Sequence, residues 1–117
     1  MNQLFEDPFF NITALVGGVF VVAGFIMLKF PPKKINFLYG YRTSASMKNQ
    51  DQWDFAQKYA AKEMMLTGLV LATSGLLTLI TDFATSIKLV VGLAMVGLAV
   101  IVFLVRVEKA IKKRFPV

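Results

Sequence analysis

The sequence predicts an all-α membrane protein with three transmembrane helices, because long apolar runs alternate with segments that hold the charges. No charged side chain occurs from Pro8 to Leu28, from Met64 to Thr81 or from Leu89 to Val105, and each run is 17 to 21 residues long. A helix of about 20 mostly apolar residues crosses the hydrocarbon core of a bilayer. The 117 residues are 56% hydrophobic and suffice for one membrane module, residues 1–117, rather than two soluble domains.

The three runs set the expected order of elements. We expect transmembrane helices over about residues 9–28, 64–81 and 86–105. Residues 29–63 are expected to form a structured cytoplasmic loop and an amphipathic interfacial helix, and residues 106–117 a basic helical tail. Because the connection between the last two spans is short, these spans are expected to be antiparallel neighbours.

The distribution of positive charge predicts the orientation. All but one of the 13 lysine and arginine residues lie in the first connection or after the third span. Three crossings place these two segments on the same side of the membrane, and cytoplasmic loops carry an excess of lysine and arginine. We therefore expect the N-terminus outside and the C-terminus inside a bacterial inner (cytoplasmic) membrane.

The same basic residues predict the partners of the chain. In a soluble protein, a net charge of +6 would suggest binding to nucleic acid. Here the cations flank apolar spans, so membrane lipids are the expected partner and nucleic acid is not. The residues expected to contact lipid head groups are Lys29, Lys33, Lys34, Arg106, Lys109, Lys112, Lys113 and Arg114.

Capping residues mark the ends of the first predicted helix. Asp7 is expected to cap it, with Pro8 at the first helical position, and the Pro31-Pro32 pair is expected to end it. We expect this span to be retained rather than cleaved as a signal peptide, because its start is acidic and its apolar run is long.

The second helix is expected to begin well before its apolar part. Asn49 and Gln52 have the spacing of a capping box, and apolar residues recur every three to four positions from Trp53 to Met64. This stretch either lies on the membrane or projects into the cytoplasm, and it serves either as an anchor alone or also in recognition. Its acids are expected to be solvated: Asp51, Asp54 and Glu63.

Small residues predict close packing between the helices, which in lipid substitutes for the hydrophobic effect. This pattern fits an intramolecular bundle and a homo-oligomer equally. In the basic tail, Glu108 and Lys112 are spaced to form an ion pair. The small residues four or seven positions apart are Ala14 with Gly18, Gly68 with Ala72, and Gly92 with Ala99.

Residue types on which catalysis and metal binding usually depend are missing. The chain has no histidine and no cysteine, which removes the commonest general base and the thiolate nucleophile. No charge lies within a predicted span, which argues against an ion-coupled carrier. We therefore expect no enzyme activity, no catalytic residue, no metal and no cofactor.

The polar loop after the first span holds the most distinctive residues. An aromatic belt at the inner interface is the simplest explanation for Tyr39, Tyr41 and Trp53. A binding surface is the alternative. We expect Gly40 to adopt a positive φ, which would fold Asn36 and Arg42 toward each other.

This loop resembles the signature of the SdpI/YfhL family. The segment Asn36–Thr43 reads NFLYGYRT, with Pro32 before it and Trp53 after it. The family pattern runs roughly Pro, Asn, Gly-aromatic-Arg-Thr, Ser, Trp. By this resemblance the residues marked in the family are Asn36, Gly40, Arg42, Thr43 and Trp53, and together with Tyr39 and Tyr41 they form the functional loop that we expect.

The resemblance implies a function as well as a fold. Family members are small bacterial integral membrane proteins. The protein that gives the family its name is an immunity protein, which protects a cell from its own secreted membrane-active peptide and holds a transcriptional repressor at the membrane. That protein has further spans ahead of this module.

These observations lead to one main hypothesis and two alternatives. The first is a non-enzymatic membrane protein that protects against a membrane-active peptide toxin, with a possible signalling role. The second is a small accessory subunit bound to a partner membrane protein. The third, a carrier of lipids or small solutes, is the weakest because no span holds an ionisable side chain.

Overall fold

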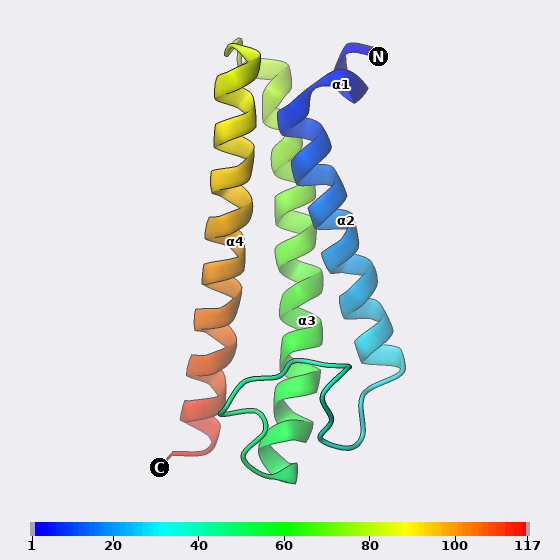
Figure 1. Ribbon diagram of the computed structural model, residues 1–117, viewed down its shortest axis with the longest axis vertical. Helices are drawn as coiled ribbons and strands as arrows, with labels where there is room; N and C mark the ends of the chain where they lie inside the picture. The colour runs from blue at the N-terminus through cyan, green and yellow to red at the C-terminus, as the bar shows by residue number, and fades with distance from the viewer. Residues whose placement is uncertain (1, 117) are drawn as a thin grey trace.

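A computed structural model describes residues 2–116 as a bundle of three long antiparallel helices, 49 × 27 × 20 Å in extent (Figure 1). The described residues contain no β-strand. The three longest helical stretches, Pro8–Lys29, Gln50–Ile80 and Thr85–Arg114, are each long and apolar enough to cross a membrane, which confirms the predicted all-α class with three helices of spanning length. The elements are α1 (Asn2–Glu6), α2 (Pro8–Lys29), α3 (Gln50–Ser74), the 3₁₀ helix η1 (Gly75–Ile80) and α4 (Thr85–Arg114).

The ends of α2 form as its sequence predicts. The Asp7 carboxylate accepts a hydrogen bond from the Phe10 amide, and Pro8 takes the first helical position, where its missing N–H costs nothing. At the other end the Phe30 amide still bonds back into the helix, and the prolines that follow cannot continue it.

The amphipathic stretch before the second span is the first half of α3. Asn49 caps it by accepting a hydrogen bond from the Gln52 amide at 2.8 Å. Gln52 does not complete the capping box, because its side chain donates to the Ala45 carbonyl instead. The helix runs without a break from Gln50 to Ser74 and keeps its direction along the bundle (Figure 1). Residues 50–63 therefore continue the apolar part of α3 in the same helix.

The change from α3 to η1 occurs where side-chain hydroxyls form hydrogen bonds with the helix backbone. Thr73 and Ser74 donate to carbonyl oxygens three or four residues earlier, which competes with the main-chain ladder. The backbone then tightens into a 3₁₀ helix over Gly75–Ile80. After the short connection that follows, α4 returns beside α3 (Figure 1).

Glycine residues bring α2 and α3 into close contact, and the predicted Gly68 is one of them, whereas the predicted Gly18 is not. A Cβ at Gly17 would lie 2.5 Å from the Gly68 carbonyl oxygen, and one at Gly24 would lie 2.6 Å from the Ala61 carbonyl oxygen. Gly18 faces open space. The predicted Ala14–Gly18 face is therefore wrong by one position, because the side-by-side glycines in the sequence do not reveal which of them meets α3.

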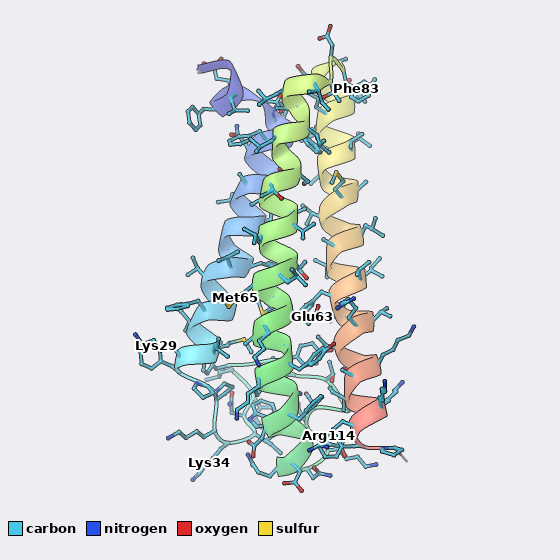
Figure 2. All side chains as sticks on the ribbon, turned by 180° about the vertical axis from the view of Figure 1, so that it is seen from behind. Lys29, Lys34, Glu63, Met65, Phe83 and Arg114 are labelled. Carbon is cyan, nitrogen blue, oxygen red and sulfur yellow. The ribbon has the colours of Figure 1, made fainter. Side chains whose placement is uncertain are left out.

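The main hydrophobic core lies at one end of the bundle, where the loop between α2 and α3 joins the three helices. Figure 2 shows Lys29, Lys34 and Arg114 at this same end and Phe83 at the opposite end. We refer to it as the loop end. The buried side chains of its core are Met27, Tyr41, Ala56, Ala60, Ala61, Phe103, Val107 and Ile111.

A partly buried ion pair closes the opposite end. Lys88 at the start of α4 donates to the Asp7 carboxylate at 2.6 Å, and Thr78 donates to the same oxygen. Burial by itself would raise the pKa of Asp7, but these hydrogen bonds, the Phe10 amide and the charge of Lys88 lower it to about 2. The carboxylate therefore stays ionised and joins the starts of α2 and α4 to η1.

Candidate functional site

The signature loop, residues 30–49, crosses the loop end of the bundle without helix or strand and packs between the three long helices (Figure 1). Such a loop must satisfy its own backbone polar groups through side chains. The residues that do so define the candidate site.

Asn36 shapes the first turn of the loop. Its side-chain oxygen accepts hydrogen bonds from the amides of Leu38 and Tyr39, and its amide nitrogen donates to the Lys34 carbonyl. The Tyr39 hydroxyl then donates to the Phe30 carbonyl just past the end of α2. Asn36 and Tyr39 therefore tie the loop to α2 locally, as asparagine does in many turns.

Gly40 has a φ of +111°, so its predicted positive φ is confirmed. It lies against Gln57 of α3, and a Cβ at Gly40 would be 2.5 Å from the Gln57 Oε1 atom. The Gln57 side chain accepts a hydrogen bond from the Tyr41 amide at 2.7 Å and donates to the Tyr41 carbonyl at 2.8 Å. Glycine is therefore required here both for its backbone conformation and for the space that Gln57 occupies.

Glu108 of α4 is the second attachment point. The hydroxyls of Tyr41 and Thr43 both donate to its Oε2 atom, at 2.7 and 2.9 Å. Burial of the Tyr41 phenol raises its pKa, and the hydrogen bond to Glu108 raises it further, so the phenol remains a donor. The prediction that the Glu108 carboxylate chiefly pairs with Lys112 is wrong, because this carboxylate accepts its hydrogen bonds from the loop.

Ser46 closes the loop on itself. Its buried hydroxyl donates to the Tyr41 carbonyl at 3.0 Å and accepts from the Thr43 amide at 2.8 Å. The Thr43 hydroxyl accepts in turn from the Ser46 amide. These bonds form a compact turn, so the Gly-aromatic-Arg-Thr segment has a single defined conformation.

Trp53 holds the start of the loop against α3. Its side chain is fully buried, and its indole N–H donates to the Pro32 carbonyl at 2.6 Å. The resemblance placed Trp53 among the loop residues, and the structure brings it there from the first turn of α3.

Within residues 2–116, no hydrogen bond joins the side chains of Asn36 and Arg42. The side chain of Asn36 forms its hydrogen bonds with the loop backbone. Arg42 is exposed, and within residues 2–116 no hydrogen bond or ion pair to its guanidinium is found. Arg42 is therefore presented by the loop rather than used to build it.

Glu63 is not the solvated acid that we expected. Its side chain is only 11% exposed and pairs with Arg106 of α4 through two hydrogen bonds, Nε to Oε2 at 2.8 Å and Nη2 to Oε1 at 3.0 Å. Figure 2 shows Glu63 on the side of α3 that faces α4. Arg106, which we predicted to contact lipid head groups, therefore pairs with Glu63. The other predicted head-group residues are exposed: Lys29, Lys33, Lys34, Lys109, Lys112, Lys113 and Arg114.

Gln57, Ser46 and Glu108 hold the loop in place, and our sequence-based set left them out. Gln57 offered a signal, because it is a polar residue on the otherwise apolar face formed by Trp53 and Ala60. Glu108 is an acid in a basic tail, which is a weaker signal. Nothing local marks which loop atoms they bind.

The site holds hydrogen-bond donors and acceptors rather than a metal-binding set. No group of three or more acidic, histidine or cysteine side chains in residues 2–116 is placed to hold a metal ion. What the arrangement does chemically is fix a loop and expose one guanidinium, a group suited to carboxylates and phosphates.

Comparison with known proteins assigns the chain to a family. Residues 33–106, which include most of this loop and the last two spans, match the SdpI/YfhL protein family. Over 67 residues the chain is 51% identical to the uncharacterized protein YfhL of Bacillus subtilis (strain 168), an alignment that covers 56% of this chain and 61% of that protein. No solved structure matches. The family match covers more than half of the chain and most of the signature loop, so this chain belongs to the SdpI/YfhL family.

Proposed function

We propose that this chain is a non-enzymatic protein of the bacterial inner membrane that protects the cell against a membrane-active peptide. Family membership supports the proposal, since the family takes its name from an immunity protein. The signature loop would be the working surface, and Arg42 the residue through which it acts.

One observation carries this assignment: side chains of α3 and α4 hold the loop by hydrogen bonds, yet Arg42 takes no part in holding it. Gln57 and Glu108 anchor the neighbours of Arg42 on both sides. Every buried side-chain nitrogen and oxygen in the described chain has a hydrogen-bond partner. An arginine that serves neither stability nor a local ion pair is suited to bind something outside the chain.

The proposed orientation places this loop in the cytoplasm. The loop end carries all of the lysine and arginine residues except Lys88, and Lys88 is neutralised by Asp7 at the other end. An excess of positive charge on one side favours that side as cytoplasmic. A cytoplasmic loop would report or respond to a peptide that has already entered the bilayer.

The test compares variants in a strain that lacks the gene, challenged with culture supernatant from bacteria that secrete a membrane-active killing peptide. Wild type and Lys48→Ala, which removes another exposed loop cation, are expected to restore survival. Arg42→Ala is expected to lose protection at equal protein abundance, and Arg42→Lys to recover little of it, because lysine lacks the planar guanidinium. Equal survival with wild type and Arg42→Ala, or no protection by wild type, would refute the proposal.

A second candidate function, accessory subunit of a larger membrane complex, is favoured by α4. Only 11% of the most apolar stretch of this helix is buried within the chain, which leaves a long face for a partner helix or for lipid. Extraction in a mild detergent followed by mass spectrometry tests this alternative. Recovery only as a monomer or homodimer argues against it.

A further inference from the structure

An apolar groove runs along the junction of α3 and α4 and opens toward the space that lipid would fill. Its volume is about 350 Å³, within the range of small-molecule sites. Apolar side chains such as Leu66, Val70, Leu98 and Val102 line it, and it ends at the ion pair between Glu63 and Arg106.

A second, cationic pocket of about 660 Å³ continues beyond that ion pair toward the C-terminus. Phe55 and Tyr59 of α3 form its aromatic side, and no acidic residue lines it among the described residues. Arg106 lines both pockets. Since Glu63 takes only two of its five N–H donors, the guanidinium has donors left for a second anion. The remaining cations of the pocket are Lys109, Lys113 and Arg114.

The length of the apolar groove matches one leaflet. On α4 it extends from Met95 to Arg106, which corresponds to about 16 Å at 1.5 Å per residue. Half of a bilayer's hydrocarbon core is about 15 Å. The groove therefore spans the depth of a single acyl chain, with the cationic pocket at the depth of the head group.

We propose that this continuous groove and pocket bind an anionic phospholipid of the surrounding leaflet, with an acyl chain between α3 and α4 and its phosphate against Arg106, Lys109 and Lys113. This goes beyond the proposed protective function and does not depend on it. A second copy of the chain fits the groove less well. In one membrane it would have the same orientation, so its own basic tail would lie at the same depth and repel this one.

The first experiment measures lipid selection. Protein is reconstituted in vesicles of equal parts phosphatidylglycerol and phosphatidylcholine, extracted gently, and analysed by native mass spectrometry. Wild type is expected to retain one phosphatidylglycerol in preference to phosphatidylcholine by roughly threefold or more. The variant Lys109→Gln/Lys113→Gln is expected to lose this preference. The matched control Lys48→Gln/Lys58→Gln removes two exposed cations that line neither pocket and is expected to keep it.

The second experiment fills the groove. Ala99 lines the groove, so Ala99→Leu is expected to reduce the retained phosphatidylglycerol as strongly as the loss of the two lysines. Gly97→Leu adds bulk to α4 where nothing lies within 4 Å and is expected to retain the lipid. Either of two lipid results would overturn the proposal: equal retention of the two lipids by wild type, or equal effects of the two charge-removal pairs. Unchanged lipid retention in Ala99→Leu would also overturn it. So would a lipid-free dimer that Ala99→Leu dissociates.

Discussion

Gln57 and Tyr41 exchange two hydrogen bonds although they lie sixteen positions apart: the side-chain amide of Gln57 pairs with both the N–H and the C=O of Tyr41. The side-chain amide of Gln57 thus pairs with the Tyr41 backbone in the way that a neighbouring β-strand would. Because Gln57 is 1% exposed, these two bonds form away from water, where unpaired groups are costly. The position of the signature loop is therefore set by a side chain of the helix behind it.

Replacing Gln57 by leucine is expected to leave the Tyr41 N–H buried without a partner, while the Tyr41 carbonyl keeps only the Ser46 hydroxyl. We expect Gln57→Leu to lower the free energy of unfolding by about 2–4 kcal/mol, measured by denaturant titration in detergent. Gln50→Leu is the control, since Gln50 is exposed and water can replace its hydrogen bonds. Equal destabilisation by the two variants would mean that the clamp on Tyr41 has no special weight.

Valine at position 40 is expected to lower accumulation of the protein in the membrane. Its β-branched side chain resists the φ of +111° and would collide with Gln57. Gly18→Val introduces the same side chain at a helical position that faces open space, and we expect normal abundance for it on immunoblots of membrane fractions. Normal abundance of Gly40→Val would contradict the strained turn.

The pair of Glu63 and Arg106 is expected to behave as a unit. Glu63→Gln is expected to lower the melting temperature in detergent, because it removes the charge that holds the bidentate pair. The same change made in an Arg106→Gln background is expected to cost clearly less, and this double-mutant cycle measures the coupling. Additive effects would show that the two side chains do not stabilise α3 against α4.

Acid is expected to weaken the opposite end of the bundle through Asp7. Its pKa in the folded chain is about 2, below the ordinary 3.8, so its contribution is complete above about pH 4 and is lost as the pH falls toward 2.

The check is the melting temperature between pH 6 and pH 2.5. Asp7→Asn keeps a capping side chain and is expected to be less stable than wild type at pH 6, with a smaller further decrease in acid. Glu6→Gln alters the exposed neighbouring acid and is expected to follow wild type. Parallel pH curves for wild type and Asp7→Asn would rule out the Asp7–Lys88 pair as the acid-sensitive element.

Orientation can be measured with single cysteines, because the chain has none of its own. Ser44→Cys, in the exposed part of the loop, is expected to react with a membrane-impermeant maleimide only after the cells are permeabilised. Asp82→Cys, in the connection between η1 and α4, is expected to react in intact cells. The reverse pattern would invert the topology and remove the cytoplasmic role that we propose for the loop.

Much of this structure was accessible from short-range patterns. The capping by Asp7 and Asn49 depends on neighbours within three positions, and the spans follow from run length. The positive φ of Gly40 was also predictable, because a glycine in a polar turn-forming segment favours that conformation. The contact face of α2 was not, since Gly17 and Gly18 differ by one position and only the approach of α3 separates them.

The sequence by itself determined that the chain forms three helices long and apolar enough to span a membrane, how α2 and α3 are capped at their starts, and which end of the bundle carries the positive charge. Length, apolarity and local capping decide these properties, and each acts within a few turns of helix. Only the tertiary structure decided that Gln57 and Glu108 hold the loop, that Glu63 pairs with Arg106, and that Arg42 is left exposed. These partners lie 16 to 67 positions apart, so their pairing depends on how the helices pack and on which buried polar groups then need one another.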